Sequence, residues 1–246
     1  MGPNEEGRRT PPPGAGTRSS PGPQASPGSH APPAGPTPPV EVRRGTDADA
    51  PVSAALHAGQ ISQGFLSALG PGFLRRLYRR IGRSPESFLL VAASQGATVG
   101  FVAGSTNVAG LYRSFLLHDG IPAGLQAAGS LITGWRRVLD TLGHASAGGT
   151  GSGRGPELLA IAVDPAWQGH GVGRLLVRSF LDEVSDRGGD AAHVVVGAGN
   201  RSAVSLYERA GFVTVQRFEL HAGTESLLMQ WDRPPGSPVP DDALPS

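Results

Sequence analysis

A glycine-rich segment, residues 168–173, contains the residue types best suited to chemistry in this chain. It reads QGHGVG and follows a short apolar run, residues 158–163. The run is too short for a typical helix and suits a buried strand, and an apolar stripe at helical spacing starts at Val172. A turn between a strand and a helix N-terminus gathers free backbone N–H groups and the positive end of the helix dipole. The segment is therefore predicted to bind an anion, most often a phosphate.

Three phosphate-binding loops could produce this pattern, and two of them fit poorly. A P-loop ends its glycine run with Lys and then Ser or Thr, but Arg174 and Leu175 stand here and the chain has no Lys. A dinucleotide fingerprint needs Gly-x-Gly-x-x-Gly directly after the strand, but residues 164–167 intervene and the glycine spacing differs. The third pattern is Gln/Arg-x-x-Gly-x-Gly/Ala. It is the acyl-CoA pyrophosphate loop of the GNAT N-acetyltransferase superfamily, which residues 168–173 resemble at every fixed position.

A second segment downstream carries the same resemblance. Residues 200–212 fit Asn-x-x-Ala…Tyr-Glu-x-x-Gly-Phe, a pattern that follows the fifth strand in the GNAT superfamily. The two motifs stand in the family's order and at the family's distance. The resemblance is specific over about residues 157–215 and architectural over residues 40–105.

The resemblance implies which residues would hold acetyl-CoA. In the family, strand four carries a bulge and splays from strand five, and pantetheine lies in the gap against the backbone of strand four. The glycine-rich loop binds the pyrophosphate, and an Asn and a Tyr further on lie along the pantetheine and near the thioester sulfur. The corresponding residues here are Ile161, Ala162, Val163, Gln168, Gly169, His170, Gly171, Val172, Gly173, Arg174, Asn200 and Tyr207.

Catalysis, on this resemblance, is direct attack of an amine on the acetyl thioester. Tyr207 would donate a proton to the leaving thiolate, and its alternative role is packing alone. The ribosomal-protein Nα-acetyltransferase branch takes its base from a Glu on strand five, where Val195 stands here, so that branch fits less well. Glu157 is the candidate base, although a solvated strand end would look the same. His193 could act through water or could be a satisfied strand histidine.

The spacing of apolar residues and of turn residues predicts an α/β (α+β) domain around a mixed, twisted sheet of six to seven strands. Helices are expected after Asp47 or Asp49, from Pro71, after Val172 and after Asn200, and Gln95-Gly96 is expected to turn a hairpin. A strand, a helix and an apolar strand over residues 158–196 form a βαβ unit, so these two strands should be parallel neighbours. The predicted strands are 40–44, 87–93, 97–105, 158–163, 191–196, one from Phe212, and 226–231.

Composition divides the chain into a domain and two tails. Residues 1–39 hold 12 of the 23 prolines and residues 233–246 resemble them, so both are predicted to be disordered around a single domain at 40–232. Residues 106–156 form a long insertion between two strands, predicted to be partly helical and partly glycine-rich. We expect this insertion to contribute to the acceptor site, with a homodimer interface as the alternative.

The remaining composition narrows the function class. The chain has no Cys and a formal charge of +1, so neither a disulfide framework nor a nucleic-acid-binding charge balance is present. We expect no metal, no membrane span and no secretory signal, and a cytoplasmic location. The sequence thus predicts an acetyl-CoA-dependent N-acetyltransferase for a small primary amine such as an amino sugar or antibiotic. The alternatives are a protein or peptide acetyltransferase and a CoA-binding module without catalysis.

Overall fold

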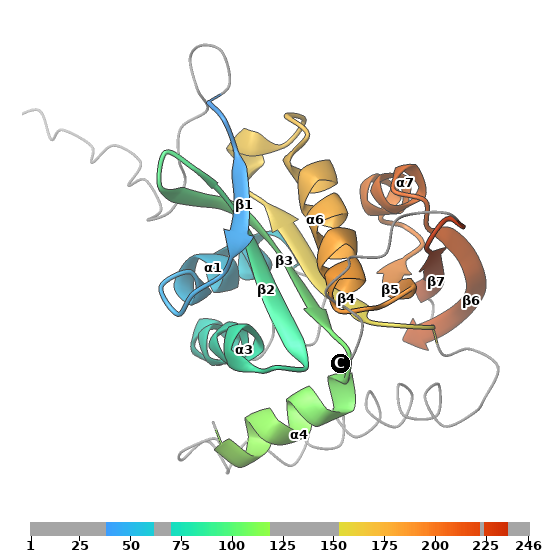
Figure 1. The fold of residues 1–246 in the computed structure, drawn as a ribbon, viewed down its shortest axis with the longest axis horizontal. Helices are drawn as coiled ribbons and strands as arrows, with labels where there is room; N and C mark the ends of the chain where they lie inside the picture. The colour runs from blue at the N-terminus through green and yellow to red at the C-terminus, as the bar shows by residue number, and fades with distance from the viewer. Residues whose placement is uncertain (1–37, 62–69, 119–152, 222–223, 236–246) are drawn as a thin grey trace, which may run out of the picture.

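A seven-stranded mixed sheet forms the centre of the computed structural model, which describes residues 38–61, 70–118, 153–221 and 224–235. The strand order is β1-β2-β3-β4-β5-β7-β6, and every neighbouring pair is antiparallel except β4 and β5, which are parallel. This confirms the predicted fold class and the predicted parallel pair (Figure 1). The strands are β1 (Glu41–Arg44), β2 (Ser87–Ser94), β3 (Ala97–Ser105), β4 (Glu157–Val163), β5 (Ala191–Gly197), β6 (Val213–His221) and β7 (Thr224–Asp232).

Helices cover both faces of the sheet. One apolar cluster joins the sheet to α6 and α7, and the other joins it to α1, α3 and α4. Because both faces are covered, β2 is buried along its whole length, which explains its unbroken apolar sequence. The helices are α1 (Ala50–Gln60), α3 (Pro71–Arg83), α4 (Val108–His118), α6 (Val172–Asp186) and α7 (Arg201–Arg209), with a 3-10 turn, η1 (Pro165–Trp167).

Strand β4 carries a bulge at Leu159. In the register with β3, Ala160 lies opposite Ala103 and Leu158 lies opposite Gly104, so Leu159 has no partner. Leu158 therefore packs into the α6 cluster, while Leu159 and Ala160 both pack toward α1 and α3. The bulge therefore shifts by one residue which side chains of β4 lie on each face of the sheet.

Asp49 occupies the N-cap position of α1, as predicted, but its carboxylate does not cap the helix. It accepts hydrogen bonds from Arg43 at 2.9 Å, from the Thr46 amide and hydroxyl, both at 2.8 Å, and from Thr98 at 2.8 Å. Burial opposes ionisation, but these bonds outweigh it and hold the pKa of the Asp49 carboxyl well below its usual range. Asp49 thus fastens α1 to β1 and β3.

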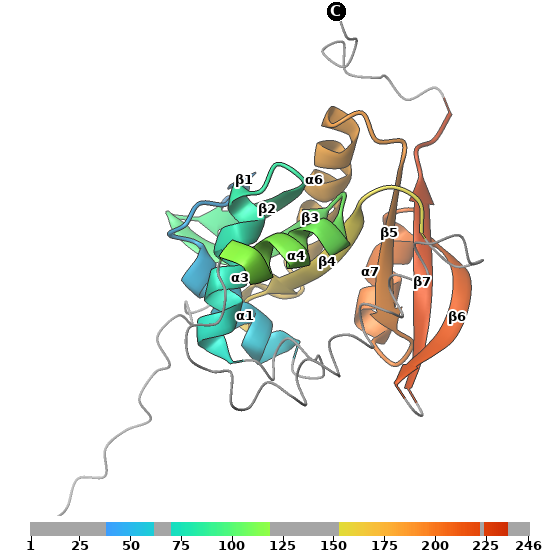
Figure 2. The same cartoon turned by 90° about the horizontal axis from the view of Figure 1, so that it is seen from below.

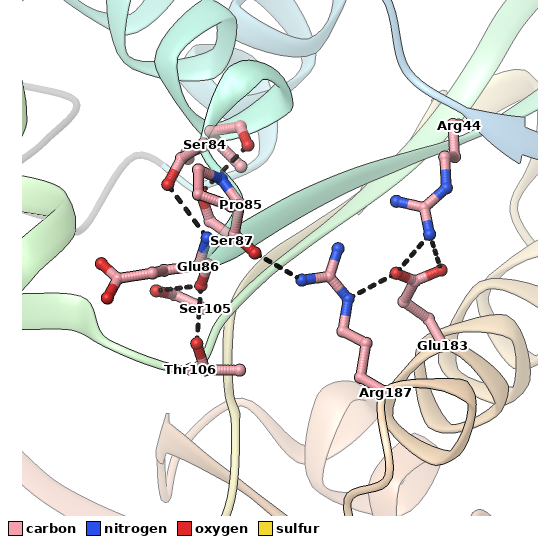
Figure 3. Close-up of polar contacts among 10 residues, drawn as sticks. Arg44, Ser84, Pro85, Glu86, Ser87, Ser105, Thr106, Glu183 and Arg187 are labelled. Carbon is pink, nitrogen blue, oxygen red and sulfur yellow. Dashed lines mark hydrogen bonds and ion pairs between the residues drawn. The ribbon is translucent and has the colours of Figure 1, made fainter. Parts of the chain in front are cut away.

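Glu183 fastens the far end of α6 to the sheet (Figure 3). Its buried carboxylate accepts two hydrogen bonds from Arg44 of β1, at 2.6 and 2.8 Å, and one from Arg187 at 2.6 Å. Arg187 also donates to the Pro85 carbonyl at 2.8 Å, and its guanidinium lies 4.8 Å from the centre of the Phe88 ring. The orientation of α6, whose first turn follows the glycine-rich loop, is therefore fixed from its opposite end.

Most predicted elements are present within a residue or two of their predicted ends. The insertion predicted to be partly helical begins with α4, and Phe115 of α4 packs edge-on against Phe73 of α3 with ring centres 4.9 Å apart. The rest of the insertion that the sequence suggested, residues 119–152, lies outside the described residues, as do residues 1–37 and 236–246. Within the described ranges, no helix is long and apolar enough to cross a membrane.

Candidate functional site

Strands β4 and β5 lie in register at a single pair of residues, Glu157 and His193. Beyond that pair the strands separate, as Figure 2 shows. On its other side β4 remains paired with β3 as far as Val163, which lies opposite Gly100. The edge of β4 that faces β5 is therefore left without a described strand partner over Ile161, Ala162 and Val163. This confirms the predicted splay and leaves backbone groups able to pair with an extended ligand.

The glycine-rich loop lies at the end of β4. Asp164 ends the strand and accepts a hydrogen bond from the Ala166 amide at 2.9 Å, which starts η1. The backbone then turns through Gly169 and Gly171, whose φ values of 80° and 83° suit glycine, and α6 begins at Val172. Among the described residues, the amides of 169–174 have no backbone acceptor. They form a set of free donors at a helix N-terminus, the arrangement that binds phosphate.

The loop has room for a ligand on its outer side. A Cβ built on Gly169 would have no atom within 4 Å, and one on Gly171 would approach only the guanidinium of Arg174, at 3.7 Å. Arg174 is exposed, so a positive side chain lies beside the free amides. Both features fit a pyrophosphate. Gly173 faces inward instead, because a Cβ there would lie 3.4 Å from Leu206 of α7.

Two predicted ligand-binding side chains stabilise the loop internally. Gln168 Nε2 donates to the Val163 carbonyl and to Gln60 Oε1, both at 3.2 Å, which connects the loop to β4 and to α1. His170 Nδ1 lies 2.9 Å from the Gln168 carbonyl and, facing an oxygen that only accepts, must be the donor. These contacts give both side chains a structural role in shaping the loop.

Asn200 and Tyr207 lie at the two ends of α7. Asn200 Oδ1 accepts from the Ala203 amide at 3.2 Å, so Asn200 is the N-cap that the sequence predicted. Its side-chain nitrogen has no partner among the described residues and could donate to a ligand. Tyr207 is buried and packs on Phe212 with ring centres 5.7 Å apart. Burial raises the pKa of its hydroxyl far above the usual range, so the group stays protonated at neutral pH.

Glu157 and His193 lie side by side where β4 and β5 separate. Glu157 Oε2 is 3.7 Å from His193 Nε2, and each side chain is about one-sixth exposed, at 16% and 15%. Glu157 is therefore mostly buried, rather than the freely solvated strand end that the sequence left open. The sequence reasoning missed the contacts of Arg154 and Gln230 with this pair. Only the short Gly-Arg-Gly segment at 153–155 hinted at a tight approach.

Comparison with known proteins decides the family. The family model "Acetyltransferase (GNAT) family" matches residues 60–212, which include the loop, the splayed strands and all of α7. The chain belongs to the GNAT acetyltransferase family. The family assignment predicted from residues 168–173 and 200–212 is thereby confirmed. Among the described residues, no group of three or more His, Asp or Glu side chains could hold a metal ion.

Curated relatives of this GNAT protein match it over short segments. A ribosomal protein bS18-alanine N-acetyltransferase of Salmonella typhimurium is 42% identical over 62 residues, 24% of this chain and 42% of that protein. A mycothiol acetyltransferase of Nocardiopsis dassonvillei is 43% identical over 56 residues, 23% of this chain and 17% of that protein. The chain thus covers less than half the length of these relatives.

A solved structure matches over nearly its full length. The yncA structure from Salmonella typhimurium, solved with its cofactor acetyl-CoA, is 14% identical with a TM-score of 0.50. The match covers 82% of this chain and 98% of that one. At this identity the similarity establishes the shared fold.

Proposed function

We propose that this GNAT protein transfers the acetyl group of acetyl-CoA to a primary amine. The observation that carries the proposal is the single register pair of β4 and β5, beyond which the β4 edge is unpaired and leads to the glycine-rich loop. Pantetheine would pair with the backbone of Ile161, Ala162 and Val163, and the pyrophosphate would accept from the amides of 169–174. Asn200 would donate to the pantetheine through its side-chain nitrogen.

Glu157 is the proposed general base. It lies at the start of the splay, mostly buried, with Oε2 3.7 Å from His193 Nε2. The attacking amine must lose a proton as its N–C bond forms, and a carboxylate at this edge of β4 can accept that proton directly or through one water. A base in this role contributes roughly 10²–10⁴-fold to the rate.

Tyr207 is the proposed general acid. Its side chain is buried, and its hydroxyl forms no hydrogen bond with another described residue, so the proton is not already committed. Burial makes this hydroxyl a weaker acid than free tyrosine. The same poorly solvated surroundings also destabilise the leaving thiolate, which offsets part of the cost of taking the proton from Tyr207.

For the acceptor, we propose a small primary amine such as an amino sugar, amine or antibiotic. Val195 supports this choice, since it stands on β5 where the ribosomal-protein branch would place its base. The second candidate is the N-terminal amine of a protein or peptide. The second candidate is favoured by the 42% identity, over 62 residues, to a ribosomal protein bS18-alanine N-acetyltransferase.

A thiol-release assay tests the proposal without background, because the chain contains no Cys. Acetyl-CoA would be supplied with a panel of small amines and a panel of peptides with free N-termini. Turnover with either panel supports an acetyltransferase, and the preferred panel identifies the acceptor class. Tight acetyl-CoA binding with no turnover on any amine would instead indicate a binding module that has lost catalysis.

A further inference from the structure

The ring of His193 is enclosed by the chain that enters β4. A Cβ built on Gly153 would lie 2.1 Å from His193 Cγ and 2.4 Å from its Cβ, so any larger residue at 153 would collide with the ring. The His193 amide also donates to the Pro156 carbonyl at 3.0 Å. The backbone of residues 153–156 therefore lies against one side of the His193 ring and limits its movement.

The carbonyl of Arg154 determines which ring nitrogen carries the proton. His193 Nδ1 lies 3.3 Å from this oxygen, and a carbonyl can only accept, so Nδ1 is the donor. The carbonyl is itself fixed, because Gln230 Nε2 donates to it at 3.3 Å while Gln230 Oε1 accepts from the Arg154 amide at 2.8 Å. In the neutral imidazole, Nε2 must therefore carry the lone pair.

That lone pair faces the proposed base. Nε2 lies 3.7 Å from Glu157 Oε2, slightly beyond hydrogen-bond distance. Catalytic hydrogen bonds are often long without substrate and shorten in the reacting complex. A neutral imidazole whose lone pair faces a carboxylate cannot form a hydrogen bond with it, because neither group carries a proton at that position. The hydrogen bond can form once Glu157 has taken up a proton.

The charged side chain of Arg154 is engaged elsewhere: its guanidinium lies 3.1 Å from Asp232 and 3.6 Å from Asp190. Gln230, the register partner of His193 on β7, is uncharged. Helices α6 and α7 pack on the opposite face of β5, which is taken by Ala192, Val194 and Val196.

We propose that Glu157 and His193 act as one proton-accepting unit, with His193 as the second acceptor. This rests on the proposed acetyl transfer. As the amine N–C bond forms and the C–S bond breaks, an amine proton moves to Glu157 Oε2 and on to His193 Nε2. Glu157 returns to the carboxylate, His193 becomes imidazolium, and Tyr207 supplies the proton on sulfur. Solvent then takes the proton from His193 and returns one to Tyr207.

His193→Asn is the informative variant. The asparagine side-chain nitrogen takes the place of Nδ1 and can still donate to the Arg154 carbonyl, while Nε2 is lost. If His193 only holds residues 153–156 in place, this variant should keep the wild-type kcat. If His193 accepts the proton, kcat at saturating substrates falls roughly tenfold or more. The low-pH limb of the kcat profile should also change, because one of the two proton-accepting groups is gone.

Two further measurements make the result decisive. Glu157→Gln with His193→Asn should be no slower than Glu157→Gln alone, since residues that act as a unit are not additive. Nitrogen NMR of labelled histidine, assigned by the signals lost in His193→Asn, should show the neutral Nδ1–H form in the full-length protein.

The outcomes separate the two proposals. Wild-type kcat and an unshifted low-pH limb in His193→Asn, or multiplicative losses in the double variant, would overturn the shared role. So would an Nε2–H tautomer, which can be detected even in a protein without turnover. A wild-type protein that acetylates no amine would refute the proposed function itself.

Discussion

Glu157 and His193 are the only residues at which β4 and β5 lie in register, and their side chains meet 3.7 Å apart at the point where the strands separate. The same pair therefore marks the start of the splay and brings two proton-accepting groups together. Parallel pairing holds the two side chains on one face of the sheet, so a displacement of either strand would break both features at once.

The glycine-rich loop can be tested against a control at the other end of the same helix. Gly169 and Gly188 have nearly equal φ values, 80° and 78°, and a Cβ on either would have no atom within 4 Å. Aspartate at each site should therefore cost a similar stability, about 1 kcal/mol. Only Gly169→Asp should weaken acetyl-CoA binding in calorimetry, because it places a negative charge against the pyrophosphate. Equal affinities in the two variants would contradict the loop assignment.

Tyr207→Phe tests the proton donor. The ring would still pack on Phe212, so folding and acetyl-CoA affinity should stay close to wild type. Since the proposed role of the hydroxyl is to protonate the leaving thiolate, kcat should fall by roughly 10²-fold, the lower range for a general acid. Steady-state kinetics and the melting temperature measure the two effects separately. A kcat within about twofold of wild type would leave Tyr207 with a packing role alone.

Glu183→Gln tests the attachment of α6. The Glu183 carboxylate is 8% exposed and bonded to two arginines, and the substitution leaves both with a weaker acceptor. Because Arg44 is largely exposed, we expect a loss of about 1–3 kcal/mol in the free energy of unfolding. The control is Glu225→Gln, whose ion pair with Arg217 is exposed at both ends and should contribute less than about 1 kcal/mol. Denaturant unfolding of the two variants measures the difference, and equal losses would contradict it.

His57 should make stability depend on pH. It lies buried on α1 with Nδ1 2.5 Å from the Tyr78 hydroxyl, and burial lowers its pKa to about 4. Unfolded histidine takes up its proton near 6.5, so between pH 6.5 and 4 the unfolded chain binds more protons. The free energy of unfolding should therefore fall as pH is lowered through this interval, by up to roughly 3 kcal/mol.

His57→Leu should flatten that dependence. Leucine suits the apolar cluster around α1 and has no proton to take up. Denaturant midpoints of the wild type and the variant, compared between pH 7 and 4.5, measure the effect above the range in which Asp49 contributes. An equally steep loss in both proteins would assign the pH dependence to other groups.

The sequence by itself determined the family, most elements and the loop that would bind the cofactor. These are local features. Apolar spacing identifies a strand or a helix, Asn200 caps the helix that it precedes, and glycines at 169 and 171 permit a turn that other residues disfavour. Each requires only neighbours within a few positions, so each can be predicted from the printed chain.

Tertiary structure decided how the proposed base is arranged. Gln230 bonds to Arg154, 76 positions away, and that contact fixes the carbonyl that orients His193. The bulge at Leu159 and the position of β7 between β5 and β6 likewise depend on pairing partners distant in sequence. The sequence supplied Glu157 and His193 as separate candidates, and only the register of two parallel strands brought them together, because strand register depends on the packing of the whole sheet.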